Sequence, residues 1–276
     1  MNKPYNYQKI YHRASETPGP ALTLMAGVHG NETAGILALQ RFIKEDMPLL
    51  RGSVTMIFGN PRAIEQSARF TEVNLNRCFL PNTEGDSYEA KRAQEIMPYL
   101  NDADALLDIH ASNIPGSEPF IICEENALPI ARKFQMHILS TGWDAIEPGA
   151  SDGYMFQQGK VGICAECGYA GDGEQYQDLA YDTLRRFLDH YDVLAYEYEE
   201  PDESLQRLLH VDQVVMKTRE DFVFTRMYPD FATLKKGECF AKDGESEYCV
   251  DRERVIVFAN PDKEVGGEAC ILGSWQ

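Results

Sequence analysis

The sequence predicts an α/β protein: a three-layer domain with a mostly parallel central sheet, followed by a small all-β domain. Two observations predict this fold class. Over the first 197 residues, short apolar runs alternate with segments of helical period. After an acidic stretch that contains Pro201, the chain changes to short β-rich segments separated by glycines and prolines. We therefore expect one domain over residues 1–197 and a second over residues 198–276.

Continuous apolar runs predict the strands of the first domain. Such runs are typical of strands that are buried on both faces of a parallel sheet. They cover residues 21–28, 53–58, 103–109, 118–123 and 161–165.

The segments between these runs predict the helices and loops. Apolar residues recur with a helical period in residues 32–45, 86–100, 127–139 and 174–194. Residues 63–81 lack a clean period, so we expect a long loop there, and such loops in compact domains are often functional. Residues 142–160 are rich in loops and contain several glycines. In the second domain, we expect short strands in residues 210–217, 221–227, 237–241, 255–258 and 269–272.

Composition excludes several classes of partner. The formal charge of −18 over 276 residues argues against non-specific binding to nucleic acid or to an anionic membrane surface. No apolar run approaches the length of a membrane span, and residues 1–11 lack the apolar core of a secretory signal. We expect a small anionic substrate, which a local basic cluster must attract. The oligomeric state stays open, with a homo-oligomer among the possibilities.

The seven cysteines, an odd number, indicate reduced thiols and a cytoplasmic location. Cys164 and Cys167 form a C-x-x-C pair, the spacing of some redox and zinc-ribbon motifs. A zinc ribbon needs a second pair, which the sequence lacks, and a thioredoxin-like motif stands earlier in its domain. We interpret the two cysteines as core thiols.

Three residues at the ends of predicted strands suggest a metal site. His29 and Glu32 follow the run 21–28 at a spacing of three, so both side chains can point the same way at the start of a helix. His110 follows the run 103–109. Two histidines and one glutamate form a common ligand set for catalytic zinc, with a position left open for water. The sequence therefore predicts one zinc ion at this edge of the sheet.

Two carboxylates accompany these residues. Glu166 ends the run 161–165, where burying a carboxylate costs free energy unless it is paired or serves a purpose. We expect it to act as the general base, and then as the acid that protonates a leaving nitrogen. Asp108 lies two residues before His110, on the same face of the strand. It either orients a ligand or is an ordinary buried aspartate.

Two arginines are candidates for binding the substrate. Arginine offers a planar fork for carboxylates and stays charged when partly buried. We expect one of Arg62 and Arg77 to polarise the scissile carbonyl and stabilise the developing oxyanion. We expect the other, together with Asn76, to hold a substrate carboxylate.

These motifs together resemble the succinylglutamate desuccinylase/aspartoacylase family, a branch of the zinc carboxypeptidase superfamily. The resemblance extends into the second domain, at residues 234–237 and 257–261, Gly266 and Leu272. In the first domain it rests on residues 27–35, 59–63, 74–77, 107–110 and 165–168, in this order and at these spacings.

The resemblance implies a zinc-carboxypeptidase-like first domain and a role for each candidate residue. Many relatives carry Asp where this chain has Asn74, a position to which we assign no chemistry. No motif fixes the acyl group or the amino acid. In the family's pattern, zinc is bound by His29, Glu32 and His110, the general base is Glu166, the tetrahedral intermediate is steadied by Arg62, and the α-carboxylate is held by Asn76 and Arg77.

We expect a zinc-dependent amidohydrolase that cleaves an N-acyl amino acid or a similar small amide with a carboxylate. The alternative is a carboxypeptidase-type metallopeptidase that acts on peptides or cell-wall fragments, for which the catalytic residues would be the same. A third interpretation, a non-catalytic binding module on a hydrolase fold, conflicts with the presence of every catalytic residue type.

Overall fold

The computed structural model describes residues 5–83, 85–112, 116–169 and 173–276. The first four residues of the predicted polar N-terminus lie outside the described residues. The chain divides into two compact units, each described here by itself: Met1–Leu139 with Glu147–Gln206, and Ser140–Ile146 with Arg207–Gln276. The domain boundary predicted after residue 197 stays a prediction.

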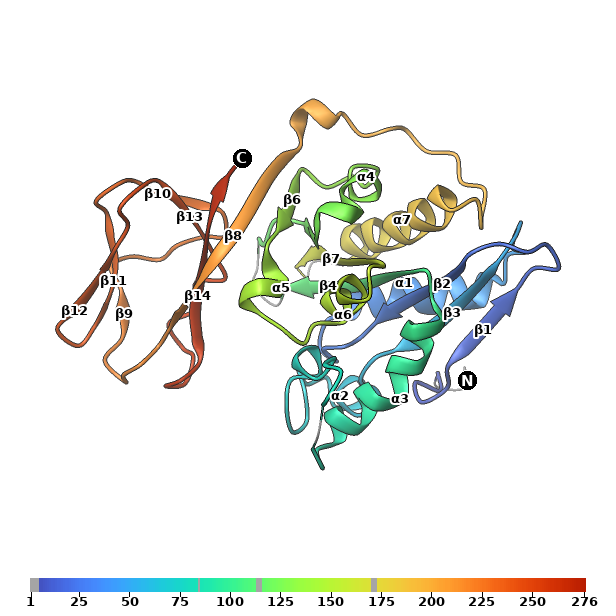
Figure 1. Ribbon diagram of the computed structural model, residues 1–276, viewed down its shortest axis with the longest axis horizontal. Coiled ribbons are helices and arrows are strands. Elements are labelled where there is room, and N and C mark those ends of the chain that lie inside the picture. The colour runs from blue at the N-terminus through green and yellow to red at the C-terminus, as the bar shows by residue number, and fades with distance from the viewer. Residues whose placement is uncertain (1–4, 84, 113–115, 170–172) are drawn as a thin grey trace. The chain divides into compact units, whose positions relative to one another are not determined.

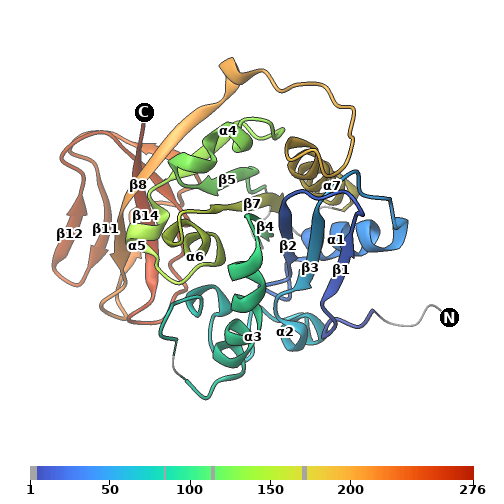
Figure 2. The same ribbon diagram turned by 45° about the vertical axis from the view of Figure 1, so that its right-hand side comes forward.

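The first unit contains a mostly parallel sheet whose strands run in the order β1-β3-β2-β4-β7-β5 (Figures 1 and 2). Strand β2 pairs in parallel with β3 and β4, and β4 pairs in parallel with β7. Strands β1 and β5 at the two sides are antiparallel to their neighbours. These strands are β1 Tyr11–Ala14, β2 Ala21–Ala26, β3 Ser53–Phe58, β4 Ala105–Ser112, β5 Phe120–Cys123 and β7 Val161–Tyr169.

Helices cover both faces of this sheet, which makes the three layers (Figure 2). Helices α1 (Thr33–Glu45) and α7 (Glu174–His190) pack against each other and against β4. On the other side, α3 (Tyr88–Asp102) and α6 (Ser151–Gln157) share a buried core with residues of β2, β3 and β4. The predicted fold class is confirmed.

Several local predictions were wrong. The segment 127–139 is not one helix: it contains the short α4 (Leu128–Ala131), and β6 (Ile138–Thr141) begins before its end. The expected loop 63–81 begins inside α2 (Pro61–Gln66) and includes the 3-10 turn η1 (Leu75–Arg77). The segment 142–160 contains α5 (Trp143–Ile146) as well as α6. Helices this short complete few intrahelical hydrogen bonds, so their sequences carry little periodic signal.

The second unit is built from antiparallel strands around an apolar core that includes Phe222, Phe240 and Ile256. Residues 140–146 join this unit, and Trp143 packs against Phe258 with ring centroids 5.7 Å apart. One sheet has the order β8-β14-β13-β10 and the other β12-β11-β9. The strands are β8 Arg207–Met216, β9 Val223–Phe224, β10 Ala232–Leu234, β11 Cys239–Asp243, β12 Ser246–Cys249, β13 Arg254–Val257 and β14 Glu268–Trp275; the turn η3 (Glu203–Leu205) precedes them, and η2 (Glu125–Ala127) precedes α4 in the first unit. Among the described residues, no helix has the length and apolar character needed to cross a membrane.

Cysteine pairing corrects one expectation. Cys239 and Cys249 are cross-strand partners in the β11–β12 hairpin and form a disulfide, so these two thiols are not reduced. Cys164 and Cys167 are free and buried, which confirms them as core thiols. The other free cysteines are Cys78, Cys123 and Cys270, all buried.

The double variant Cys239→Ser/Cys249→Ser should lose about 3 kcal/mol of unfolding free energy, because the bond closes a short loop in the unfolded chain. Urea denaturation followed by circular dichroism measures this difference. A dithiol reductant should destabilise the natural chain and leave the variant unchanged. Equal stability of the oxidised protein and the variant would contradict the prediction.

Candidate active site

The candidate site lies at the carboxyl ends of the parallel strands β2 and β4. His29 and Glu32 stand in the turn between β2 and α1, and His110 lies near the end of β4. Because β2 and β4 are adjacent and parallel, their carboxyl ends meet at the same edge of the sheet. Glu32 occupies the N-cap position of α1, yet its side chain does not cap the helix. Its carboxylate turns toward the two histidines instead.

The three side chains converge and are buried. Nδ1 of His29 lies 2.8 Å from Oε1 of Glu32. Nδ1 of His110 lies 3.0 Å from Oε2 of the same carboxylate. One nitrogen or oxygen from each of the three residues lies within 4.8 Å of the other two. The structure therefore brings His29, Glu32 and His110 together as the sequence analysis expected.

Asn74 fixes the tautomer of His29. Its Oδ1 accepts a hydrogen bond from the backbone N–H of Asn76 at 3.0 Å, which identifies this atom as the amide oxygen. The same oxygen lies 3.0 Å from Nε2 of His29, so Nε2 must carry the proton and donate it. Nδ1, which faces Glu32, is then the nitrogen that would bind a metal ion held beside this carboxylate. Sequence reasoning assigned no role to Asn74, and nothing in its spacing indicated this contact.

Asp108 orients His110 in a similar way. Oδ2 of Asp108 lies 3.2 Å from Nε2 of His110 and also accepts a hydrogen bond of 2.5 Å from Oγ of Ser151. The Asp108 side chain is fully buried. A buried carboxylate beside the far nitrogen of a ligand histidine is the usual arrangement around protein metal sites. Of the two interpretations left open for Asp108, its position favours that of an orienting residue.

The charges of this cluster suit a cation. Burial alone would raise the pKa of Glu32, but the two histidines outweigh that effect and hold its pKa well below the usual range. Burial lowers the pKa of His110, whereas Asp108 and Glu32 raise it well above its ordinary value. Both shifts favour a carboxylate anion at Glu32 with positive charge beside it, which a metal ion bound there would also supply. Two imidazoles and one carboxylate fit the ligand preference of zinc.

Arg69 is the arginine that contacts this cluster. Its Nη1 donates a hydrogen bond of 3.1 Å to Oε1 of Glu32, and its backbone oxygen accepts one from the N–H of Gly30. Its side chain remains about half exposed, at 47%. No pattern in the sequence pointed to Arg69. Its position eight residues before Arg77 gave no local signal, because the intervening segment has no regular period.

Glu166 lies on β7, directly beside His110 in the parallel register of β4 and β7. Potential ligand atoms of His110, Cys164 and Glu166 lie within 4.8 Å of one another. The predicted general base thus stands next to the predicted metal ligands.

Gly168 follows Glu166 on β7 with a positive φ of 81°, and a Cβ there would overlap the ring of Tyr176.

Arg62 has different surroundings. Its Nη1 lies 3.5 Å from Oε1 of Glu72, and its guanidinium stacks over the ring of Tyr88 at 4.0 Å. The side chain is about half exposed, at 52%. The structure places Arg62 against these two residues and not against Glu32.

Asn76 contacts the start of α6, and Arg77 contacts the segment before it. Oδ1 of Asn76 accepts a hydrogen bond of 3.2 Å from the backbone of Ser151. Arg77 pairs with Glu147, which is mostly buried, and donates a second hydrogen bond of 2.7 Å to the backbone oxygen of Asn76. The arginine expected to bind a substrate carboxylate is therefore already paired with a protein carboxylate.

Close backbone approach explains two glycines of the first motif. A Cβ on Gly30 would lie 2.0 Å from the backbone carbon of Ala63, and one on Gly35 would lie 2.7 Å from the backbone oxygen of Ile109. Any larger residue would push α2 or β4 away from the cluster. Glycine is required at both positions by contact.

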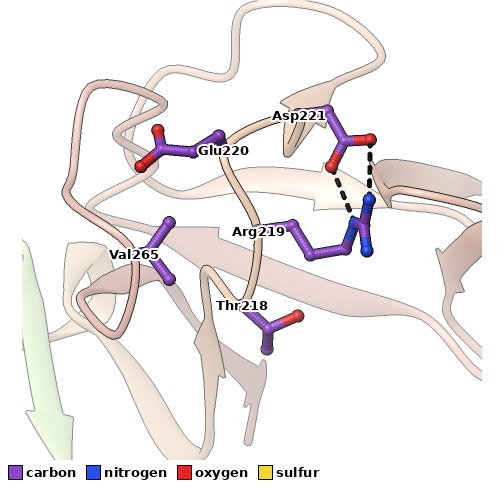
Figure 3. Close-up of a pocket in the computed structure, with 5 residues that line it drawn as sticks. All are labelled: Thr218, Arg219, Glu220, Asp221 and Val265. Carbon is purple, nitrogen blue, oxygen red and sulfur yellow. Dashed lines mark hydrogen bonds and ion pairs between the residues drawn. The ribbon is translucent and has the colours of Figure 1, made fainter.

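A cavity of about 480 Å³ lies in the second unit and is lined by Thr218, Arg219, Glu220, Asp221 and Val265 (Figure 3). Its arginine is already paired, with Nε of Arg219 2.9 Å from Oδ1 of Asp221. The hydroxyl of Thr218 donates to Asp243. None of the residues predicted for the site lines this cavity.

Comparisons with known proteins match both parts of the chain to one family. The family model of the succinylglutamate desuccinylase/aspartoacylase catalytic domain matches residues 18–191, and that of the AstE/AspA barrel-sandwich hybrid domain matches residues 206–273. The chain is 30% identical to a succinylglutamate desuccinylase of Pseudomonas aeruginosa, over 92% of this chain and 84% of that protein.

Solved structures share the fold at low sequence identity. The crystal structure of succinylglutamate desuccinylase from Vibrio cholerae has a TM-score of 0.78 at 20% identity and covers 94% of this chain and 82% of that one. The product-bound ectoine utilization protein EutE (DoeB) from Ruegeria pomeroyi has a TM-score of 0.72 at 18% identity, covering 98% and 97%.

Replacing one of the three converging side chains should abolish metal binding. We expect the variant His110→Ala to retain less than a tenth of the zinc of the natural chain after dialysis, because a two-residue site binds zinc far more weakly than three converging ligands. Elemental analysis of purified protein measures the stoichiometry. His137→Ala removes an exposed histidine outside the cluster and should keep full occupancy. Full zinc in His110→Ala would exclude His110 as a ligand.

Proposed function

The chain belongs to the succinylglutamate desuccinylase/aspartoacylase family, and on that premise we propose that it is a zinc-dependent amidohydrolase of N-acyl amino acids. Members of this family are hydrolytic deacylases that act on amide bonds, and this chain is an enzyme of that kind. The proposal rests above all on the convergence of His29, Glu32 and His110 beside Glu166.

We propose that His29, Glu32 and His110 hold one zinc ion. A zinc ion bound there supplies Lewis-acid activation of water and of the substrate carbonyl. The chain's own contribution is orientation. Asn74 and Asp108 fix the two rings so that both Nδ1 atoms face the Glu32 carboxylate. Such outer contacts are commonly as important as the ligands themselves.

Glu166 is proposed as the group that moves the proton. Its place beside His110 puts a carboxylate within reach of a water that attacks the carbonyl. It accepts the proton of that water and then donates it to the leaving nitrogen, so that an amine and a carboxylic acid are released. One carboxylate thus serves both halves of the reaction.

For stabilisation of the oxyanion, the contacts favour Arg69. It approaches the cluster through Glu32, whereas Arg62 pairs with Glu72 and stacks on Tyr88. A guanidinium whose side chain is half exposed can turn from Glu32 toward a bound substrate. The sequence analysis expected this role for Arg62, and a matched pair of variants distinguishes the two arginines.

Asn76 and Arg77 are proposed to hold the carboxylate of the amino-acid moiety. Because Arg77 is paired with Glu147, the substrate carboxylate has to share or displace that partner. We propose that the substrate is a small anion and that the protein is cytoplasmic. The active form is a single chain or a homo-oligomer. Five free, buried cysteines support that location, whereas the Cys239–Cys249 disulfide is an observation against it.

The variant Glu166→Gln should keep zinc and lose turnover by about 10²–10⁴-fold, because the amide cannot accept the proton. The assay follows amine release by zinc-loaded protein from a panel of N-acyl amino acids and short peptides. Near-normal turnover by this variant would remove Glu166 from the mechanism. Turnover of peptides alone would replace the deacylase with the carboxypeptidase-type alternative.

The variant Arg69→Ala should lower kcat by about 10²–10³-fold, as the loss of one oxyanion donor does in other hydrolases. Arg62→Ala should change kcat less than tenfold, since its partners are Glu72 and Tyr88. Zinc content and melting temperature of both variants serve as controls. A larger loss of kcat in Arg62→Ala than in Arg69→Ala would assign oxyanion stabilisation to Arg62 instead.

A further inference from the structure

One irregular loop carries two residues that contact the cluster. Arg69 near its start contacts Glu32, and Asn74 at its end contacts His29. Residues 69–74 form neither a helix nor a strand. Contacts outside regular secondary structure must therefore fix the loop.

Glu89 supplies those contacts. It lies in the first turn of α3, and its side chain is fully buried. Oε1 accepts hydrogen bonds of 2.7 Å from the backbone N–H of Thr71 and 2.7 Å from its hydroxyl. The backbone N–H groups of Glu72 and Val73 donate to the same carboxylate at 3.3 and 3.2 Å. Three consecutive residues of the loop thus hydrogen-bond to one side chain.

The same carboxylate ties the loop to α2. Nδ2 of Asn60 donates to Oε1 of Glu89 at 3.1 Å, and Oδ1 of Asn60 accepts from the backbone of Ala63 at 3.1 Å to cap α2. Ala63 is the residue against which Gly30 packs. Through Asn60, Glu89 therefore connects the loop to the turn that carries His29 and Glu32.

The donors around Glu89 require an anion. Burial raises the pKa of Glu89, but hydrogen bonds from Thr71, Asn60 and Val73 outweigh this effect and lower it. The partial positive charge at the start of α3 favours the same form. A glutamine would direct N–H donors at other N–H donors and leave some buried groups unpaired, which is unfavourable.

We propose that Glu89 is a positioning residue for the deacylation, holding the 69–74 loop so that Arg69 and Asn74 reach Glu32 and His29. The expected effect of Glu89 on turnover rests on the proposed function, whereas its expected effect on metal binding does not. Glu89 itself does not touch the substrate or the metal. It acts through the two residues at the ends of the loop.

The test compares Glu89→Gln with Glu95→Gln, which alters an exposed glutamate on the same helix. A milder pair is Thr71→Val, which removes only the hydroxyl bond to Glu89, and Thr71→Ser, which keeps it. Zinc affinity is measured by competition with a chelator in the absence of substrate. The melting temperature, kcat and KM are measured for each variant with the best substrate of the panel.

We expect Glu89→Gln and Thr71→Val to weaken zinc binding by about 10-fold or more, because Asn74 no longer orients His29. Their kcat should fall more than their KM rises, since Arg69 acts on the oxyanion. Thr71→Ser and Glu95→Gln should match the natural chain. In a double-variant cycle, Thr71→Val should lower kcat by a smaller factor in the Arg69→Ala background than in the natural chain, because both changes remove the same interaction.

The proposal is overturned if Thr71→Val and Thr71→Ser have the same zinc affinity and kcat. It is equally overturned if Glu89→Gln lowers only the melting temperature, or if the cycle with Arg69→Ala is additive. Should Glu89→Gln fail to fold, the Thr71 pair alone decides. The natural chain could also hydrolyse no member of the panel while Glu89→Gln still weakens zinc binding. That result would support the positioning role of Glu89 and contradict the proposed function.

Discussion

The candidate site depends on one buried carboxylate. Glu32 receives His29 and Arg69 on one oxygen, and His110 and the backbone N–H of Ala111 on the other. These partners come from the turn after β2, an irregular loop and the end of β4. A buried anion that lost them would be strongly unfavourable, so the same contacts that suit a metal ion also hold three segments together.

A second buried carboxylate, much farther along the chain, repeats this arrangement. Glu89 collects donors from the 69–74 loop and from Asn60, as Glu32 collects them from the cluster. The two anions therefore fix the loop from both sides, one through its middle and one through Arg69. Irregular backbone buries its polar groups only where partners of this kind exist.

In a protein of charge −18, the arginines near the site are already paired with acidic side chains. Arg62, Arg69 and Arg77 each contact a glutamate: Glu72, Glu32 and Glu147. Their charge is balanced in the absence of a substrate. A substrate carboxylate consequently competes with protein carboxylates, which favours ligands that also make other contacts in the site.

The sequence by itself determined the α/β class, the strands β2 and β3, and the convergence of His29, Glu32 and His110. Long apolar runs and residues at strand ends depend on local pattern and on the geometry of a parallel sheet, which a sequence shows directly. Only the tertiary structure decided that Arg69 contacts Glu32, that Asn74 sets the tautomer of His29, and that Glu89 holds the loop between them. Those contacts join residues far apart in the chain, and the 69–74 loop that they hold has no period, so no spacing in the sequence encodes them.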